Sequence, residues 1–369
     1  MSVSNEHPAG EFSQLNALRG IAAVTVVMSH FTVIDPLREL LQTPLRFLLN
    51  GHNAVIMFFL ISGFVLTLQL TSPHAPRYRE WLIKRICRIY LPYLAVFSVA
   101  CAMMSFSYRG PVSWAGVWAN IAWDGQIEMS EVVEHVVFVG TYRAEHILPV
   151  IWTLIYEMRI AFFFPLLVCA VQHLRACHTI ALALVISAVG YLLLVANGND
   201  PYNANLKVRW ELTAHFAGIF VAGAALAQHR THWLGWLAVG GRKAIVFSAS
   251  LAFYFFSRSV LRIAPAGLAD FLFDWGVSIG AAGLISVVLS SRRAALLLAW
   301  QPAVFMGRIS YSLYLTHTVV LLTVIHLMPS ADTALLALAV AAVLVTPVAA
   351  LAHFAFEKPA IVIGRALTR

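Results

Sequence analysis

Charged residues are scarce in this chain of 369 residues. They make up 11 % of the sequence, whereas 60 % of the residues are apolar and the mean hydropathy is +0.79. A soluble domain of this composition would expose large apolar patches to water, which excludes an ordinary soluble enzyme or binding module. No long polar interval separates the apolar segments between residues 15 and 356. The composition therefore indicates one polytopic membrane domain.

Cysteine is also scarce, and nucleotide-binding motifs are missing. The four cysteines show no metal-type CxxC spacing, so we expect small apolar side chains, no disulfide and no bound metal. They are Cys87, Cys101, Cys169 and Cys177. The sequence contains neither a GxGxxG nor a P-loop pattern. The excess of 25 Lys and Arg over 17 Asp and Glu is typical of a cytoplasmic membrane face and does not indicate a nucleic-acid partner.

The hydropathy pattern predicts an all-α polytopic membrane protein with about ten transmembrane helices in one bundle. The expected spans are 15–33, 54–71, 91–108, 150–171, 178–196, 208–228, 244–262, 270–290, 309–328 and 333–356. Lys and Arg are about twice as frequent on one side of these spans as on the other, which places both termini in the cytoplasm. We expect cytoplasmic tails at 1–14 and 357–369 around an integral domain at 15–356. The first apolar run has no basic region before it and no cleavage site after it, so it should be retained.

The first span carries Arg19 near its start and His30 near its end. Eleven helical steps of about 100° and about 1.5 Å bring His30 to within about 20° of Arg19, roughly 16 Å further along. One helix face therefore holds a fixed cation and a titratable imidazole at different depths. Ionisable groups inside a membrane are costly and usually functional. An anchoring arginine and a histidine bonded to a neighbouring helix would give the same pattern.

Two further charged features lie beside or within the spans. Arg85 and Arg88 are three residues apart, and on a helix they form a cationic ridge together with Lys84. Such a ridge suits the phosphate groups of a cytosolic ligand, but ordinary topology charges explain it equally well. Glu157 lies inside the fourth span, where a carboxylate needs a partner. A structural salt bridge and a direct catalytic role are equally consistent with this position.

Several polar or small residues carry weaker signals. Polar stripes at helical spacing either hold the bundle together or line a cavity; they comprise Glu211 with His215, and Ser310 with Tyr314 and His317. Gly63 in the second span favours close approach of two helix backbones. The interval 109–149 is rich in tryptophan, which is typical of a helix lying in the membrane interface. The alternative, functional interpretation is that this interval forms a wall of the site for an incoming acceptor.

Six fragments taken together resemble the membrane acyltransferase-3 family of bacterial inner-membrane O-acyltransferases. In chain order they are LRGIAAVTVVMSHF with Arg19 and His30, FFLISGF, KRICRIYLPY, IWTLIYEMRIAFFFP with Glu157, SYSLYLTH and FEKP. The family's usual acidic residue before the paired phenylalanines of the second span is Ile56 here. Some members append an SGNH-type domain, and we expect a single-module acyltransferase without it.

The resemblance implies transfer of an acyl group, commonly acetyl from acetyl-CoA, to a hydroxyl of a carbohydrate or glycolipid acceptor at the lipid bilayer of the bacterial inner membrane. It also implies that Arg19 and His30 are the essential pair and that Arg85 and Arg88 meet the CoA phosphates. The chemistry needs a base, and an imidazole with an unperturbed pKa of about 6.5 suits it. A buried carboxylate such as Glu157 would orient that imidazole.

Two mechanisms fit these residues. Either His30 takes the acceptor's proton while the hydroxyl attacks the thioester, or a His30 nitrogen is transiently acylated. A proton-coupled secondary transporter is the alternative function, since ten spans with internal Arg, His and Glu would suit a carrier. Many transporters have two matching halves, whereas the cationic ridge and the first-span histidine have no counterpart in the second half. A non-catalytic scaffold leaves Arg19, His30 and Glu157 unexplained.

Overall fold

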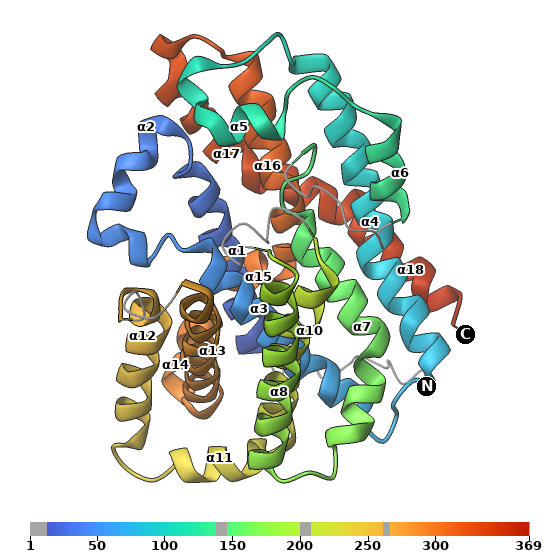
Figure 1. Ribbon diagram of the computed structural model, residues 1–369, viewed down its shortest axis with the longest axis vertical. Coiled ribbons are helices and arrows are strands. Elements are labelled where there is room, and N and C mark those ends of the chain that lie inside the picture. The colour runs from blue at the N-terminus through green and yellow to red at the C-terminus, as the bar shows by residue number, and fades with distance from the viewer. Residues whose placement is uncertain (1–12, 138–145, 200–207, 261–265, 369) are drawn as a thin grey trace.

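The computed structural model describes residues 13–137, 146–199, 208–260 and 266–368, which fold into helices without a β-strand (Figure 1). The ten long helices are α1 (Ser13–Phe31), α3 (Gly51–Leu70), α4 (Tyr78–Ser107), α7 (Ile151–Val171), α8 (Ala176–Ala196), α10 (Trp210–Gln228), α12 (Arg242–Val260), α13 (Ala266–Ser290), α16 (Ser310–Leu327) and α17 (Ala334–Ala352). The short α-helices are α2 (Asp35–Arg38), α5 (Gly116–Ala122), α6 (Met129–Val137), α11 (Arg230–Leu237), α14 (Arg292–Leu298), α15 (Gln301–Arg308) and α18 (Lys358–Ala366). Four short 3₁₀ turns, η1 (Glu39–Gln42), η2 (Pro44–Phe47), η3 (Ser113–Ala115) and η5 (Ala331–Thr333), and one π-helical turn, η6 (His353–Glu357), complete the described chain.

Within the described residues, eight helical segments are long and apolar enough to cross a membrane. Two bent pairs raise the number to ten if each pair is one span. The pairs are Ser13–Phe31 with Asp35–Gln42, bent by 114°, and Arg230–Leu237 with Arg242–Ser259, bent by 112°. The prediction of an all-α, multi-pass membrane protein is therefore confirmed. The bends make the first and seventh expected spans less regular than their hydropathy suggests.

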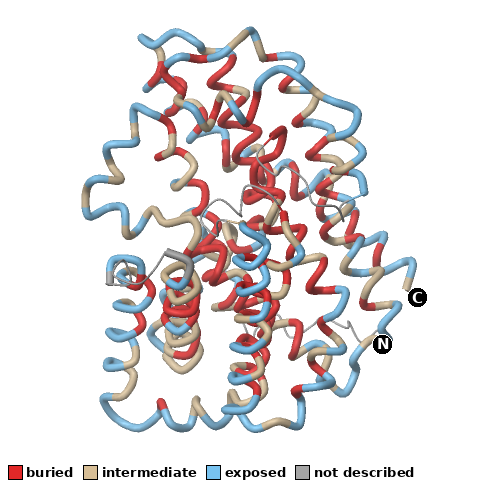
Figure 2. Tube along the Cα trace, in the orientation of Figure 1, coloured by how far each residue is buried: buried red, intermediate tan, exposed pale blue. Residues whose placement is uncertain are grey.

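The inner helices carry the core, and the outer ones turn apolar side chains outward. Figure 2 shows buried residues concentrated along the central helices, whereas α8 and α12 are largely exposed on their outer faces. The exposed side chains of α8 include Leu184, Val185 and Leu192. A surface of this kind suits lipid tails and is costly in water, so it agrees with a membrane setting.

Close contacts between backbones fix the centre of the bundle. A Cβ added at Gly63 on α3 would lie 2.1 Å from the carbonyl oxygen of Phe220 on α10, and one at Gly223 would lie 2.3 Å from that of Leu60. Only glycine permits this crossing, so the expected close approach at Gly63 is confirmed. Helix α1 packs against α3, α15 and α16, and this neighbourhood brings its polar face to the middle of the molecule.

The cationic ridge is helical from its start. The third expected span, 91–108, is only the second half of α4, which already begins at Tyr78. Trp81, Cys87 and Ile89 are buried along this first half, so one face packs while the opposite face remains polar. Arg85 and Arg88 therefore lie on a packed helix rather than in a loop. The C-terminal helix α18 packs against the same helix α4.

The tryptophan-rich interval forms a cap over one end of the bundle, built from η3, α5 and α6 (Figure 1). Trp114 Nε1 donates to the carbonyl oxygen of Pro329 at 3.0 Å, and Trp123 Nε1 donates to that of Ile147 at 3.0 Å. Both indoles are buried: Trp114 ties the cap to the loop after α16, and Trp123 ties two parts of the cap to each other. Residues 138–145 of this interval and residues 1–12 of the expected N-terminal tail lie outside the described residues.

Candidate active site

The imidazoles of His30 on α1 and His317 on α16 face each other. His30 Nδ1 lies 2.9 Å from the carbonyl oxygen of Val26 and 3.2 Å from His317 Nε2, while His317 Nδ1 lies 3.1 Å from the carbonyl oxygen of Leu313. Since a carbonyl oxygen only accepts, each Nδ1 is assigned the hydrogen. His30 Nδ1–H then also faces the lone pair of His317 Nε2. The second nitrogen of His30, Nε2, keeps a lone pair to which no described residue donates, and this is the form that a general base needs.

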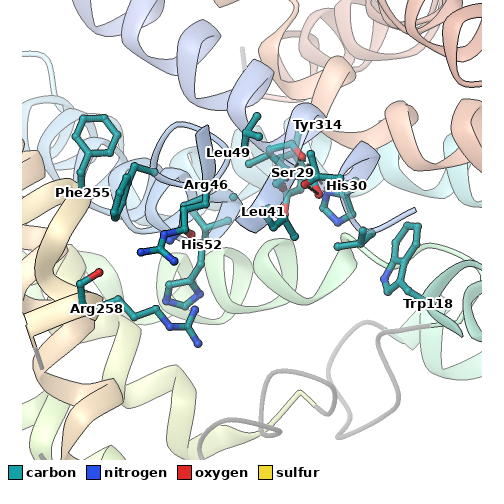
Figure 3. A pocket seen from close by; sticks show the side chains of 18 of the residues that line it. Ser29, His30, Leu41, Arg46, Leu49, His52, Trp118, Phe255, Arg258 and Tyr314 are labelled. Carbon is teal, nitrogen blue, oxygen red and sulfur yellow. Dashed lines mark hydrogen bonds between the residues drawn. The ribbon is translucent and has the colours of Figure 1, made fainter. Parts of the chain in front are cut away.

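His30 opens onto a cavity of about 630 Å³. Trp118, Trp152 and Tyr314 form aromatic parts of its wall, and the ring of Trp118 lies 5.4 Å from that of His30 between centroids. The hydroxyl of Tyr314 is held by Thr153 Oγ1 at 2.8 Å. Figure 3 shows Ser29, His30 and Tyr314 close together, with Trp118 to one side. A cavity with aromatic walls and a few polar groups is typical of a small-molecule site.

Charged side chains gather around Arg19, toward the other end of α1. An Arg85 nitrogen donates to Glu157 Oε1 at 2.5 Å, and these side chains are only 12 % and 21 % exposed. Arg85, Arg88, Glu157 and Glu357 are all close enough to act electrostatically on Arg19. These five residues, which we call the cationic cluster, carry three positive charges against two negative ones. A net positive, partly shielded cluster is suited to binding an anionic ligand.

Glu357 is held on the bundle side of this cluster. Ser312 Oγ donates to Glu357 Oε2 at 2.6 Å, and His353 Nδ1 lies 2.9 Å from the same oxygen. The π-helical turn η6 brings His353 and Glu357 to one side, and Glu357 is only 3 % exposed. The FEKP fragment thus places a carboxylate against α16. Its contacts are those of a residue that secures the helices around the cationic cluster.

The structure brings Arg19, Arg85, Arg88 and Glu157 together, but it separates them from His30. The hydrogen-bonding partner of Glu157 is Arg85, and the side chain beside the His30 imidazole is His317. Glu157 is near enough to act electrostatically on Tyr314, whose hydroxyl points to Thr153. The groups that orient His30 directly are therefore the Val26 carbonyl and the His317 imidazole, whereas a carboxylate was expected from other histidine-based acyl transfers.

A second histidine, His52 at the start of α3, also lines the cavity. His52 Nε2 lies 2.6 Å from Asp274 Oδ1, and His215 Nε2 lies 3.0 Å from Asp274 Oδ2. His215 Nδ1 in turn lies 2.8 Å from Ser187 Oγ. A buried carboxylate thus holds two imidazoles in a polar chain that runs from the cavity wall into the bundle.

Sequence reasoning missed most of these partners. His317 stood out only as part of a polar stripe, and nothing in its local pattern linked it to His30. His52 and Asp274 are on different helices and carry no joint spacing signal. Glu357 was visible only as part of the FEKP fragment. Ile56, which replaces the family's usual acid, is fully buried and apolar, so this position contributes packing here.

Within the described residues, the helical membrane bundle, the imidazole pair at a cavity and the separate cationic cluster are features of a membrane-embedded transferase. The chain belongs to the acyltransferase-3 family, because that family's model, an acyltransferase domain, matches residues 12–354, nearly the whole chain. The protein is therefore a membrane acyltransferase. No curated protein and no solved structure matches it. The family resemblance expected from the six fragments is confirmed.

Replacing Glu157 with Gln should lower acyl transfer more than thermal stability. Glutamine keeps the size of the side chain and a hydrogen-bond acceptor for Arg85, but it removes the charge that balances the three arginines. We would measure transfer rate and Tm for wild type and Glu157→Gln in the same detergent. Glu39→Gln changes an exposed acid outside the cationic cluster and should affect neither. If the Glu157→Gln protein unfolds or fails to insert, the role of Glu157 is a purely structural salt bridge.

Proposed function

We propose that the protein transfers an acyl group, most simply acetyl, from acyl-CoA to a hydroxyl of a carbohydrate or glycolipid acceptor, with His30 as the reacting imidazole. The observation that carries this proposal is the pair of contacts at His30 Nδ1, with the Val26 carbonyl and with His317, from which the tautomer is assigned. Its Nδ1–H is held by a carbonyl and faces His317, which leaves the Nε2 lone pair without a described donor. A sugar hydroxyl is a poor nucleophile at neutral pH, and such a nitrogen is well matched to receive its proton.

In direct transfer, the hydroxyl oxygen attacks the thioester carbonyl carbon while His30 Nε2 takes the hydroxyl proton. The carbon–sulfur bond then breaks, the new ester is released, and the proton passes to the CoA thiolate to give free CoA. In the relay, Nε2 itself attacks the thioester carbonyl carbon and CoA leaves as the thiolate, which takes up a proton. The acceptor hydroxyl then attacks the same carbon, the carbon–nitrogen bond breaks to return the imidazole, and the hydroxyl proton is released, which balances the one that CoA took up. In both routes His317 acts as a positioning residue, because its Nε2 accepts from His30 Nδ1–H and supports positive charge on that ring.

The donor would bind at the cationic cluster. CoA carries several phosphate charges, and guanidinium groups bind phosphate oxygens through charge-assisted hydrogen bonds. The excess of Lys and Arg on one side of the spans supports a cytoplasmic position for both termini and for this cluster, in the bacterial inner membrane. Acyl-CoA would thus enter from the side on which it is made, with Arg19, Arg85 and Arg88 on its phosphates and His30 nearer the opposite face.

Purified protein in proteoliposomes, supplied with isotopically labelled acetyl-CoA and a mixture of glycosides, tests this function. We expect the label to appear as an ester on the acceptor, with one CoA released for each ester formed. A proton-coupled transporter would instead carry a solute across the bilayer without cleaving the thioester. Proton-dependent solute uptake with intact acetyl-CoA would therefore replace the proposal with the rival function.

A further inference from the structure

We propose that His52, held by the buried carboxylate of Asp274, is the base that takes the proton of the acceptor hydroxyl, while His30 carries the acyl group. This inference rests on the proposed function and selects its relay route. His52 is then a second catalytic residue, and Asp274 is a positioning residue that acts through it. The imidazoles of His30 and His52 line the same cavity (Figure 3).

Two side chains of the described cavity wall can accept a proton at neutral pH. The wall contains His30 and His52, and no Asp or Glu is among its described residues. The arginines of the wall are permanently charged, and the phenol of Tyr314 keeps its proton at neutral pH. A general base for an acceptor bound in this cavity is therefore one of the two imidazoles.

The hydrogen bond of His52 leaves one of its nitrogens free for a ligand. His52 Nε2 lies 2.6 Å from Asp274 Oδ1, and since a carboxylate only accepts, this nitrogen is assigned the hydrogen. The lone pair of the neutral ring is then on Nδ1, to which no described residue donates. The His52 side chain is 23 % exposed, so a molecule in the cavity can reach it. A carboxylate that orients a base in this way is typical of histidine-based acyl transfer.

A buried polar chain holds Asp274 in place. Trp275 Nε1 can only donate, and it donates to Ser187 Oγ at 2.9 Å. Ser187 Oγ lies 2.8 Å from His215 Nδ1, and His215 Nε2 lies 3.0 Å from Asp274 Oδ2. Every hydrogen of this chain has an acceptor if Ser187 donates to a neutral His215, which then donates to the carboxylate. The negative charge of Asp274 is therefore available to stabilise an imidazolium at His52.

His30 has no such carboxylate. Its Nδ1 faces the carbonyl oxygen of Val26 and the imidazole of His317, and both groups are neutral. An acyl group on Nε2 with a hydrogen on Nδ1 gives the ring a positive charge that these neighbours do not cancel. Such an acyl-imidazole stays reactive toward a hydroxyl. The two environments thus suit His30 for carrying the acyl group and His52 for taking the proton.

Packing between α1 and α3 places the two imidazoles at neighbouring positions of the cavity. Gly51, which precedes His52, packs on Ser29, which precedes His30, and a Cβ added at Gly51 would overlap Ser29 Oγ. The cavity has a volume of about 630 Å³, whereas small-molecule sites span about 300–1,000 Å³. A sugar bound between the two rings can therefore present one hydroxyl to both of them.

The second half of the relay is then complete in atoms and charges. The hydroxyl oxygen attacks the acyl carbon on His30 Nε2 while His52 Nδ1 takes the hydroxyl proton. The carbon–nitrogen bond breaks, its electron pair returns to His30 Nε2, and the ester leaves. His52 finally releases the proton to water, which balances the proton that the CoA thiolate took up in the first half.

Measuring the two half-reactions separately tests this assignment. Purified protein in nanodiscs is mixed with labelled acetyl-CoA, first alone and then with the mixture of glycosides, and released CoA, label on the peptide that contains His30, and ester are followed by rapid quench. Without glycosides, wild type should release about one CoA per protein and hold the label on His30. Adding glycosides should start continuous ester formation. His30→Ala should show neither step.

His52→Gln should separate the two steps. Glutamine can still donate to Asp274, but it cannot take a proton, so we expect the first CoA release and the label on His30 to persist while ester formation falls by about 10²–10⁴. Asp274→Asn removes the charge and should give the same split with a smaller loss in kcat and little change in KM for glycosides. His173→Gln makes the same change as His52→Gln at an exposed position and should behave as wild type.

Three results would overturn the inference. They are ester formation at the wild-type rate in His52→Gln, loss of the first CoA release together with ester formation in both His52→Gln and Asp274→Asn, and ester formation by wild type without any label on His30. The second result would give the polar chain a structural role, and the third would favour direct transfer. Wild type that cleaves no acetyl-CoA, with or without glycosides, would instead refute the proposed function.

Discussion

Replacing His30 with Ala should abolish acyl transfer while leaving the protein inserted and folded. Loss of a general base typically costs about 10²–10⁴ in rate, and loss of an acylated nucleophile costs more. His30 is half-buried at the end of α1 and lines the cavity, so removal of its ring enlarges the cavity without opening the core. The measurement is transfer from labelled acetyl-CoA by purified wild type and variant, with Tm as the readout of folding.

Two companion variants sharpen this result. His173→Ala removes an exposed histidine and should transfer at the wild-type rate. His317→Gln keeps a hydrogen-bonding group beside His30 but cannot reproduce the imidazole, so we expect an intermediate loss in kcat with little change in KM. Near-normal transfer by His30→Ala would show that His30 does not take part in the reaction. His52 would then be the next candidate for the general base at the cavity.

Replacing Arg88 with Ala should weaken CoA binding by about ten- to a hundredfold. Each charge-assisted hydrogen bond is worth about 1.5–3 kcal/mol, and about 1.4 kcal/mol corresponds to a factor of ten. Arg88 is half-buried, so salt should screen its contact in part, and the loss should be larger at low ionic strength. CoA affinity across a salt series, measured in nanodiscs, tests this prediction.

The comparison with Arg85 separates binding from folding. Arg85→Ala should weaken CoA binding similarly, but it also leaves the Glu157 carboxylate without its ion-pair partner and should therefore lower Tm, unlike Arg88→Ala. Arg79→Ala, an exposed arginine on the same helix, serves as the control. His30→Ala should bind CoA nearly as wild type does. Unchanged CoA binding in both Arg85→Ala and Arg88→Ala would mean that the ridge only sets the orientation of the helix in the membrane. Arg292 and Arg293 would then be the next candidates for binding the donor.

The sequence predicts what depends on local periodicity. The apolar runs identify the spans, and helix geometry alone puts Arg19 and His30 at opposite ends of one face of α1. The start of α4 could not be predicted from hydropathy, because its first half packs on one face only and is too polar to register as a span. The same holds for the bend after α1, where apolar residues continue although the chain turns by 114°.

The partners of the reacting groups could not be predicted, because they depend on contacts between distant helices. Glu157 was expected to orient His30, but its hydrogen bond goes to Arg85 and the neighbour of His30 is His317. His52 gave no signal at all, since its importance comes from Asp274 on another helix and from a cavity that both α1 and α3 line. Single residues of the right type are visible in a sequence, whereas their pairing requires the packed bundle.

Mass spectrometry of the cell-surface glycans and glycolipids of a strain lacking this protein tests the central claim most directly. The account predicts that one or more of these molecules loses the mass of an acyl group, that wild-type protein restores it, and that His30→Ala, expressed and inserted at the same level, does not. Glycan and glycolipid masses that are unchanged without the protein, or that are restored equally by His30→Ala, would contradict the account.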